Sequence, residues 1–331
     1  MIVYVNKIVK IKPGSGKRLI EMNMIQNLFI LSFSLFLVIK GAMLSVKYAD
    51  QLAVNFQLSK YVVGFIFVAI ISILPEALIS INSSLEGVPA FGLATLFASN
   101  VADLTIVFAI IIFVSGRSIK IESKILKNNI AYPFLFLMPV ILGLDGYYSR
   151  IDGTILITSG VIFFYFTYKA GNKNTPALNR DRRIKNLIFL ILSILSLMVG
   201  SHFTVTSAVD LAHSLRINPI LIGIFIVAIG TTIPELIFSI KAVKKQKDSL
   251  AVAAILGTVL ADATIIVGIM AIINPFSFPQ KIIYVTGIFM LLTSFILYYF
   301  MYTEKNISKK EGLFLFVFWI IFILTEFFIN N

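Results

Sequence analysis

The 331-residue sequence contains no cysteine and only two histidines, His202 and His213. The absence of cysteine excludes disulfides, zinc thiolate sites and thiol catalysis. Charged residues are also scarce, at 13% of the chain against 58% hydrophobic residues, and the mean hydropathy is +0.95. A soluble domain does not need that much apolar surface, whereas a domain embedded in a bilayer does. We therefore interpret the chain as an all-α polytopic membrane protein, multi-pass in the cell membrane.

Acidic residues are outnumbered, with 16 Asp and Glu against 28 Lys and Arg, which gives a net charge of +12. On a soluble protein this excess would suggest nucleic acid. Here the cations lie in short gaps between apolar runs, so membrane topology explains them better. We expect the lipid bilayer as surroundings, no nucleic-acid partner and no obligate protein partner.

Apolar runs long enough to cross the hydrocarbon core predict about ten transmembrane helices. They cover roughly residues 25–46, 60–84, 90–114, 129–148, 152–170, 184–207, 219–242, 249–273, 281–301 and 311–329. The fourth run contains two prolines, Pro133 and Pro139.

The polar gaps predict the domain organisation. Residues 1–24 are basic and lack a signal-peptide cleavage site, so we interpret them as an extramembrane extension, with Met22 or Met24 as an alternative start. A polar gap divides the apolar runs five and five. The predicted units are an extension at 1–24, a first five-helix repeat at 25–170, a cytoplasmic linker at 171–185 and a second five-helix repeat at 186–331.

The two halves contain an internal repeat. Shifting residues 41–110 by 159 positions places them on residues 200–269 without a gap. The sequence "GFIFVAIISILPE" thereby falls on "GIFIVAIGTTIPE", and each copy has an aspartate 27 residues after its glutamate. Hydrophobic composition alone does not reproduce Pro-Glu and Asp at fixed distances.

Charges in the loops predict that the two repeats face opposite ways. The loop after the first Pro-Glu is "INSSLEGVP", without a cation, whereas the equivalent loop in the second half is "IKAVKKQKDS", with four lysines. Short basic loops stay in the cytoplasm, so equivalent loops lie on opposite sides. The halves are therefore predicted to form inverted repeats, as in many secondary transporters. The basic N-terminal extension does not fit this topology, because ten helices would place it outside.

Four acids, Glu76, Asp103, Glu235 and Asp262, lie inside predicted membrane segments. A charge at that depth costs roughly 2.5–3.5 kcal/mol on insertion scales. Protonated carboxyl groups that join helices would be a structural explanation for one isolated acid. Two symmetry-related pairs instead indicate that the acids face one another, water or a cation.

The surrounding residues offer oxygen ligands. Pro75 and Pro234 lack an N–H group, so the carbonyls near Ile71 and Gly230 lose their usual helical partners. Hydroxyls precede the glutamates at Ser72, Thr231 and Thr232, and precede the aspartates at Ser99 and Thr258. Back-bonding to helix carbonyls is an alternative explanation for each hydroxyl. An all-oxygen set favours Ca²⁺, Na⁺, Mg²⁺ or H⁺ over zinc or copper.

These motifs resemble those of the cation/Ca²⁺ exchanger superfamily. That family has a Gly-Thr/Ser-Ser/Thr-x-Pro-Glu motif in two inverted alpha repeats, followed on the next helix by Gly-Ser-Asn-x-x-Asn/Asp. Here the first motif corresponds to "ISILPE" and "GTTIPE", and the second to "ASNVAD" and "GTVLAD". The resemblance covers roughly residues 30–110 and 190–270, and the remaining segments match only in number and hydrophobicity.

The resemblance implies ten helices and four cation sites at mid-membrane, with the first and sixth helices sliding during alternating access. By matching position it implies central Ca²⁺ ligands shared with Na⁺ at Glu76 and Glu235, mainly backbone-carbonyl ligands at Ser72, Thr231, Ala69 and Ala228, Na⁺-site ligands at Ser99 and Thr258, and Asp103 and Asp262 around the innermost site. It implies no enzyme activity and no cofactor, with Ca²⁺ and Na⁺, or H⁺, as transported ions.

The sequence also departs from the family pattern. Ile73 stands where the second repeat has Thr232, which removes a hydroxyl and puts one Na⁺ site in doubt. Asp103 often corresponds to asparagine, and Thr258-Val259 replaces Ser-Asn. Four like charges a few ångströms apart cannot all ionise cheaply and would titrate as a group, which favours a role for protons.

The leading hypothesis is therefore an antiporter that exports Ca²⁺ against entering Na⁺ or H⁺. A cation channel would usually need symmetric rings of acids from several subunits and a filter loop. An intramembrane diaspartyl protease would use Asp103 and Asp262, but its Gly-x-Gly-Asp motif is missing and it would not need the paired glutamates.

Overall fold

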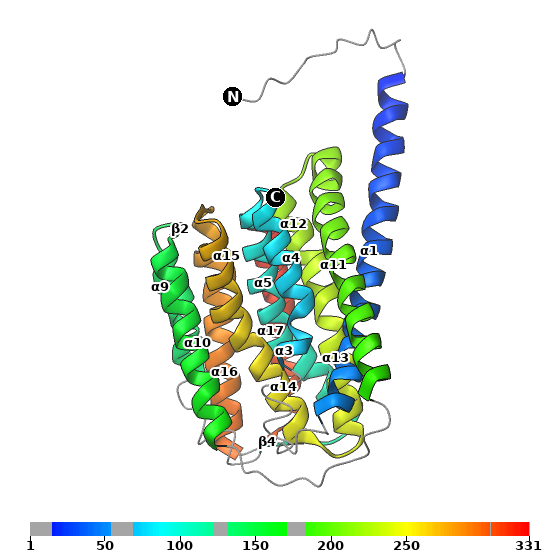
Figure 1. The fold of residues 1–331 in the computed structure, drawn as a ribbon. Coiled ribbons are helices and arrows are strands. Elements are labelled where there is room, and N and C mark those ends of the chain that lie inside the picture. The colour runs from blue at the N-terminus through cyan, green and yellow to red at the C-terminus, as the bar shows by residue number, and fades with distance from the viewer. Residues whose placement is uncertain (1–14, 54–68, 122–131, 171–182, 305, 331) are drawn as a thin grey trace.

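The computed structural model describes residues 15–53, 69–121, 132–170, 183–304 and 306–330, and it is a bundle of helices with two short two-stranded sheets (Figure 1). Seven helical stretches in this part of the chain are long and apolar enough to cross a membrane: Met24–Ala49, Pro89–Ser115, Ile184–Leu215, Pro219–Lys244, Asp248–Ile273, Ile282–Thr303 and Lys309–Asn330. They coincide with the first, third and sixth to tenth predicted segments. The protein is therefore a polytopic helical membrane protein.

The elements follow in chain order. The first half contains α1 (Ser15–Ala53), α3 (Ala69–Ser72), α4 (Leu74–Leu85), α5 (Pro89–Ala102), η3 (Asp103–Val107), α6 (Phe108–Ser115), α8 (Tyr132–Leu135), α9 (Leu137–Leu142) and α10 (Arg150–Ala170). The second half contains α11 (Arg183–Leu215), α12 (Pro219–Ile222), η5 (Gly223–Val227), α13 (Ala228–Lys244), α14 (Asp248–Ala261), η6 (Asp262–Ile266), α15 (Val267–Ile273), η7 (Ile282–Gly287), α16 (Ile288–Glu304) and α17 (Lys309–Asn330). The η elements are π-helical turns that continue the neighbouring α-helices.

Two strand pairs tie the ends of the bundle. β1 (Ile119–Lys120) pairs antiparallel with β4 (Asn306–Ile307), and β2 (Tyr147–Tyr148) pairs antiparallel with β3 (Phe276–Ser277). Figure 1 places β4 at the bottom and β2 at the top of the bundle, and we call these ends the lower and the upper face.

Two helices extend beyond the predicted membrane segments. α1 begins at Ser15 and α11 at Arg183, within the predicted extension and linker, but the stretches apolar enough to cross a membrane begin at Met24 and Ile184, close to the predicted starts at 25 and 184. Residues 1–14 of the extension, 171–182 of the linker and the start of the second predicted segment, up to 68, lie outside the described residues. The fourth segment, predicted over 129–148, is helical only from Tyr132 to Leu142 within its described part, and it is interrupted at Phe136. Two prolines remove helical N–H donors there, and the positive φ of Gly146 (79°) turns the chain into β2.

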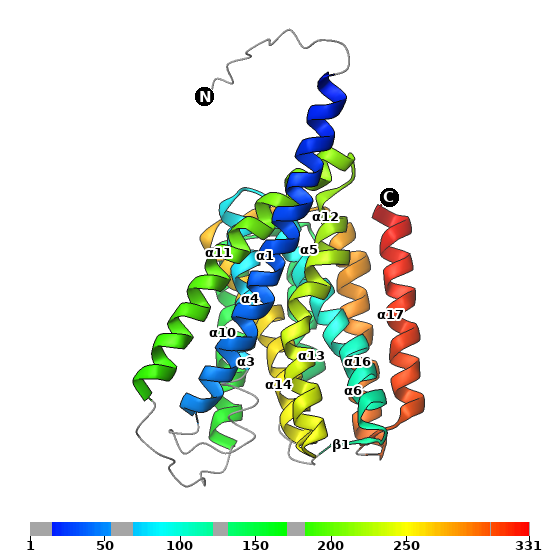
Figure 2. The same cartoon turned by 90° about the vertical axis from the view of Figure 1, so that its right-hand side faces the viewer.

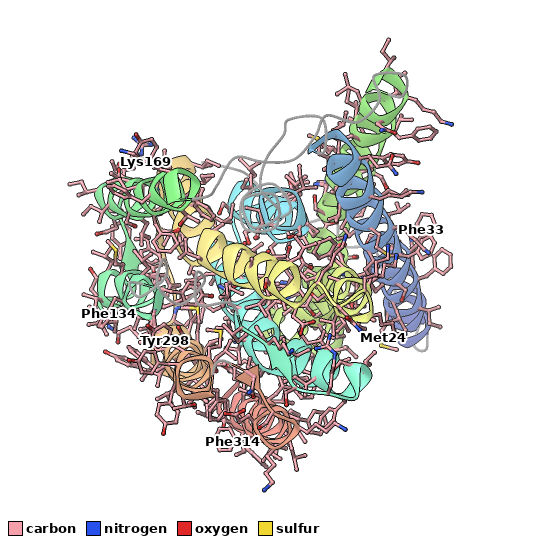
Figure 3. All side chains as sticks on the ribbon, turned by 90° about the horizontal axis from the view of Figure 1, so that it is seen from below. Met24, Phe33, Phe134, Lys169, Tyr298 and Phe314 are labelled. Carbon is pink, nitrogen blue, oxygen red and sulfur yellow. The ribbon has the colours of Figure 1, made fainter. Side chains whose placement is uncertain are left out.

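Burial separates the central helices from the peripheral ones. In the most apolar window of Asp248–Ile273, 89% of the residues are buried, and in that of Pro89–Ser115 78%, against 22% in Lys309–Asn330. Figure 3, a view from below, shows the labelled side chains of Phe33, Phe134 and Phe314 on the outside of the bundle. The outer helices therefore present apolar surface of the kind that lipid covers.

α1 and α11 lie side by side and cross antiparallel (Figure 2). Ser45 donates a hydrogen bond to Ser193 (3.0 Å), and Thr204 donates one to Ser34 (3.0 Å). The 159-residue shift interchanges these two pairs.

Two glycines permit the close approach of α1 and α11. A Cβ atom on Gly41 would lie 3.0 Å from Leu197 Cγ, and one on Gly200 would lie 2.9 Å from Val38 Cγ2. These contacts are also interchanged by the same shift. The helix pair thus packs through two equivalent glycine contacts, which the internal repeat relates to each other.

An ion pair at the lower face fastens the central helices together. Both guanidinium nitrogens Nη1 and Nη2 of Arg117 donate to Asp248, at 2.6 and 2.8 Å, and Nη2 also donates to the carbonyl of Val243. The backbone N–H of Lys120 donates to the same carboxylate. The hydrogen bonds to Asp248 raise the pKa of Arg117 above its ordinary value, so the guanidinium group of this ion pair stays protonated.

Candidate functional site

Four buried acids from both halves of the chain form the centre of the candidate site. Glu76 of α4, Asp103 of η3, Glu235 of α13 and Asp262 of η6 are at most 3% exposed. The elements that carry them also touch across the halves, because η3 contacts α13 and α14, and η6 contacts α4 and α5. The chain therefore brings the predicted acids into one buried region.

None of the eight carboxyl oxygens of these acids has a hydrogen-bond partner. The groups are nevertheless close enough to interact electrostatically: Glu76, Asp103 and Asp262 all act on Glu235, and Glu76 and Asp103 act on Asp262. Buried carboxylates without partners are costly, and they occur where a cation, a proton or water satisfies them. The arrangement leaves these carboxyl oxygens available to a cation or a proton.

The acids do not form a compact metal cluster by themselves. Among the described residues, no three His, Cys, Asp or Glu side chains lie close enough together to hold a metal ion. A cation at this position would therefore need carbonyl and hydroxyl oxygens in addition to carboxylates, as hard cations such as Ca²⁺ commonly have.

The backbone differs between the two Pro-Glu motifs. In the first half the helix is interrupted at Ile73, between α3 and α4, and Pro75 lies in the first turn of α4. In the second half α13 continues through Pro234 without a break. The isoleucine that replaces a threonine hydroxyl is thus also the residue at which the first helix breaks.

A π-helical turn begins at each aspartate of the site. η3 starts at Asp103 and η6 at Asp262, which are equivalent positions in the two repeats. Thr105 and Thr264, also equivalent, each donate a hydrogen bond to the carbonyl four residues earlier, at 2.5 and 2.7 Å. Single π turns shift the helical hydrogen bonds by one residue and frequently occur at functional sites. They fix the direction in which each aspartate leaves its helix.

The predicted hydroxyl ligands are buried and make local hydrogen bonds. They donate to carbonyls of their own helices, from Thr231 to Ala228, from Thr232 to Ile229, from Ser99 to Leu96 and from Thr258 to Ala254. This is the back-bonding that the sequence offered as the alternative explanation. It does not exclude ligation, because a hydroxyl that donates its proton to a carbonyl still presents oxygen lone pairs. Thr231 also lies beside Glu76, although its proton is directed to Ala228.

One hydrogen bond joins the two halves at the site. The hydroxyl oxygens of Ser72 and Thr258 are 2.9 Å apart and share a hydrogen bond in which either group can be the donor. This bond connects α3 to α14 across 186 residues of sequence. Ala69, another predicted ligand, is the first residue of α3, and Ala228 begins α13 with a buried side chain.

Sequence reasoning missed two polar residues near the site. Tyr132 of α8 is 1% exposed, its hydroxyl has no partner, and Asp103 and Asp262 both act on it electrostatically. Asn100, one turn before Asp103, is fully buried with an unpartnered side-chain oxygen. Neither is repeated in the other half, where the 159-residue shift gives leucine and valine, so the repeat could not reveal them. The asparagine of the second motif, matched here by "ASNVAD", was the available signal for Asn100.

A family model described as "Sodium/calcium exchanger protein" matches residues 27–169 and 185–328. These stretches lie one in each half and together make up most of the chain.

Three relatives support the match. The chain is 28% identical over 222 residues to an uncharacterized membrane protein of Methanocaldococcus jannaschii (65% of this chain, 71% of the relative), and 27% identical over 262 residues to the inner membrane protein YrbG of Escherichia coli (72% and 79%). It is 23% identical over 352 aligned residues to the sodium/calcium exchanger MaX1 of Methanosarcina acetivorans, which covers 92% of this chain and 99% of the relative.

The fold is also similar to that of a solved exchanger. The sodium–calcium exchanger NCX_Mj, in a structure soaked with 2.5 mM Na⁺ and 10 mM Sr²⁺, matches with a TM-score of 0.69 at 24% identity, over 91% of this chain and 99% of that chain. At this level of identity, the likeness establishes a common fold.

Proposed function

Since the chain belongs to the sodium/calcium exchanger protein family, we propose that it is a secondary active antiporter that exchanges Ca²⁺ for Na⁺ or H⁺ across the cell membrane by alternating access. The observation that carries this proposal is the set of eight carboxyl oxygens, contributed by both halves, that are buried without hydrogen-bond partners. The relative named as a sodium/calcium exchanger, which aligns over nearly its whole length, supports it.

We propose further that the chain folds as ten transmembrane helices in two inverted five-helix repeats, 25–170 and 186–331, with an extension at 1–24 and a cytoplasmic linker at 171–185. The antiparallel pairing of α1 with α11 supports this arrangement, because its hydrogen bonds and glycine contacts are interchanged by the 159-residue shift. The π turns at equivalent aspartates and the match of the family model to both halves support it too.

The proposed ligands share a hard-oxygen chemistry. Glu76 and Glu235 would bind Ca²⁺ and Na⁺ directly, with the other predicted ligands completing the coordination shells through carbonyls, hydroxyls and carboxylates: Ala69, Ser72, Thr231, Thr232 and Ala228 around the glutamates, and Ser99, Asp103, Thr258 and Asp262 on the following helices. Carboxylate, carbonyl and hydroxyl oxygens together give the six to eight ligands that Ca²⁺ takes.

Competition for the same oxygens would couple the two ions. A cation in the site excludes the other ion, and it also neutralises the acids. Moving bare carboxylates past a closed apolar barrier is costly, so the loaded site reorients more easily than the empty one. Because the empty site reorients less easily, the protein would exchange one ion for the other and would not let a single ion leak across the membrane.

H⁺ is the second candidate for the coupling ion. The site has four acids, and Asp103 and Asp262 have no hydrogen-bond partners and interact with each other. In addition, Ile73 offers no side-chain oxygen where the second repeat has Thr232. Fewer hydroxyls and more acids support a role for H⁺ in this protein.

The experiment that tests the proposal is ⁴⁵Ca²⁺ uptake into proteoliposomes under an outward Na⁺ gradient, a pH gradient or neither. Glu235→Gln should abolish gradient-driven uptake, because an amide cannot neutralise Ca²⁺. Glu326→Gln is the matched control. Glu326 is also a buried acid in a membrane helix, but Thr286 and Asn330 both donate to its carboxyl group. Retained uptake in Glu235→Gln, or equal loss in both variants, would contradict the proposal.

A further inference from the structure

A basic cavity opens at the lower face between α1 and α13. Its volume is about 440 Å³, and its walls come from the C-terminal part of α1, the second half of α13 and the loop that leads to α14. Four lysines line it: Lys47, Lys241, Lys245 and Lys247. None of the described residues that line it is acidic, so this lining repels free cations and attracts anions.

Among the side chains that the structure describes, no acid pairs with a lysine of this cavity. In the described parts of the chain, the ion pairs join Arg117 to Asp248 and His202 to Glu86, and neither includes a cavity lysine. Asp248, which follows Lys247 in the sequence, is occupied by Arg117 and by the backbone of Lys120. The positive charge of the cavity is therefore not compensated by these groups.

At the equivalent place in the other half of the bundle, polar contacts join the two helices. There, α11 and α4 are joined by a hydrogen bond from Asn82 to Ser201 (2.7 Å) and by the pair of His202 with Glu86 (3.3 Å). Under the 159-residue shift Asn82 corresponds to Lys241 and Glu86 to Lys245.

The partners of those two residues are not reproduced at the lower face. Ser201 corresponds to Ala42 and His202 to Met43, neither of which can pair with an ammonium group. The lysines at the lower face thus have no partner among the described side chains of α1, whereas the equivalent residues at the upper face, Asn82 and Glu86, contact Ser201 and His202 of α11. An external anion could interact with these lysines instead.

The rest of the cavity wall is apolar, from Leu44, Ile237, Phe238 and Leu250. Leu44 is 42% exposed, so part of this apolar wall faces the outside of α1. A ligand that fits both the lysines and the apolar wall is an amphiphile with an anionic headgroup. Basic pockets between transmembrane helices at the cytoplasmic side bind anionic lipid headgroups.

We propose that this cavity is a binding site for the phosphate headgroup of an anionic phospholipid of the cytoplasmic leaflet, which bridges Lys47 of α1 to Lys241 and Lys245 at the end of α13. The cavity also reaches Pro234, the residue before Glu235. A bound headgroup therefore holds α1 against the helix that carries one of the site's acids. The consequence for transport rests on the proposed exchange function, whereas the binding itself does not.

The test measures lipid retention directly. The full-length protein is released from nanodiscs of phosphatidylcholine with phosphatidylglycerol, and retained lipids are counted by native mass spectrometry. We expect bound phosphatidylglycerol in the unaltered protein, and about fivefold weaker retention for each lysine removed in Lys47→Gln, Lys241→Gln and Lys245→Gln. Lys309→Gln with Lys310→Gln is the matched control, because both lysines are exposed at the start of α17 and lie outside the cavity lining.

A second variant removes the lipid without removing a lysine. Met43→Glu gives Lys245 an internal acid at the position of His202 in the other half, so phosphatidylglycerol retention should fall in this variant too. Equal retention in all variants, equal loss in the Lys309 and Lys310 control, or equal retention of phosphatidylcholine would overturn the site. Displacement of the lipid by inorganic phosphate at millimolar concentration would overturn its assignment to a lipid.

The outcome does not depend on transport activity. If ⁴⁵Ca²⁺ exchange is absent but phosphatidylglycerol retention follows the lysines, the lipid site stands and the proposed function fails. If exchange is present but phosphatidylglycerol retention does not depend on the lysines, the proposed lipid site is wrong and the proposed exchange function is supported.

Discussion

Tyr132 is the residue at which the structure adds most to the site. Its buried hydroxyl has no partner and lies in the field of Asp103 and Asp262. This hydroxyl is therefore a free donor: a hydrogen bond from it to one charged aspartate would contribute about 1.5–3 kcal/mol and would orient that carboxylate when a cation binds. Tyr132 would then act as a positioning residue.

We expect Tyr132→Phe to raise the KM for Ca²⁺ about tenfold with a smaller change in maximal rate, measured by ⁴⁵Ca²⁺ uptake. Tyr148→Phe is the control, because Tyr148 is also a buried tyrosine, but it donates its hydrogen bond to the carbonyl of Pro139 near the upper face. Tyr148→Phe should lower the stability of the fold and leave the KM for Ca²⁺ unchanged. An unchanged KM in Tyr132→Phe would remove this tyrosine from the site.

At the residue scale the internal repeat identified the four acids that the structure buries together, but it did not identify Tyr132 and Asn100 beside them. Glu76 and Glu235 were found because a Pro-Glu pair inside an apolar run repeats at a fixed distance. Tyr132 could not be found this way, since a tyrosine is compatible with an apolar helix and its equivalent in the second half is leucine. Whether these residues bind ions remains a prediction.

At the element scale, α1 and α11 pack through Gly41 and Gly200. Because a Cβ atom on Gly200 would meet Val38 at 2.9 Å and the backbone oxygen of Ser34 at 3.1 Å, the backbone itself blocks a larger side chain. We expect Gly200→Leu to lower the free energy of unfolding by about 1–3 kcal/mol. The measurement is the apparent Tm of the purified protein in detergent.

Val199→Leu is the control for this prediction. Val199 is 51% exposed beside Gly200, so a larger side chain there faces outward and should leave Tm unchanged. A Gly200→Leu variant as stable as Val199→Leu would mean that the helices tolerate separation at this contact.

Helix positions followed from hydropathy, whereas helix details did not. Apolar runs correctly located the seven long spans, because a bilayer requires about 20 apolar residues in each. The π turns at Asp103 and Asp262 escaped prediction, since one shifted hydrogen bond changes neither composition nor periodicity enough to be seen. The break at Ile73 escaped for a related reason: proline predicts a disturbance, but the same proline at 234 leaves α13 continuous.

At the scale of the whole molecule, the inverted topology remains a prediction with a direct test. The sequence has no cysteine, so single cysteines can be introduced without a background. Glu86 and Lys247 lie in the loops after the two Pro-Glu helices, at the upper and lower face, and both residues are exposed.

We expect a membrane-impermeant maleimide to label Glu86→Cys on intact cells and to label Lys247→Cys only after permeabilisation. The reason is that basic loops are retained in the cytoplasm. Labelling of both cysteines from the same side would contradict the inverted arrangement.

The central claim is that carboxylates from two inverted repeats jointly bind a hard cation inside the membrane. The most direct measurement is a density map of the purified protein in Ca²⁺, or an anomalous difference map in Sr²⁺. We predict one strong cation peak within ligand distance of oxygens from both Glu76 and Glu235. A map without such a peak, in which the two glutamates turn to separate protein neighbours, would contradict the account.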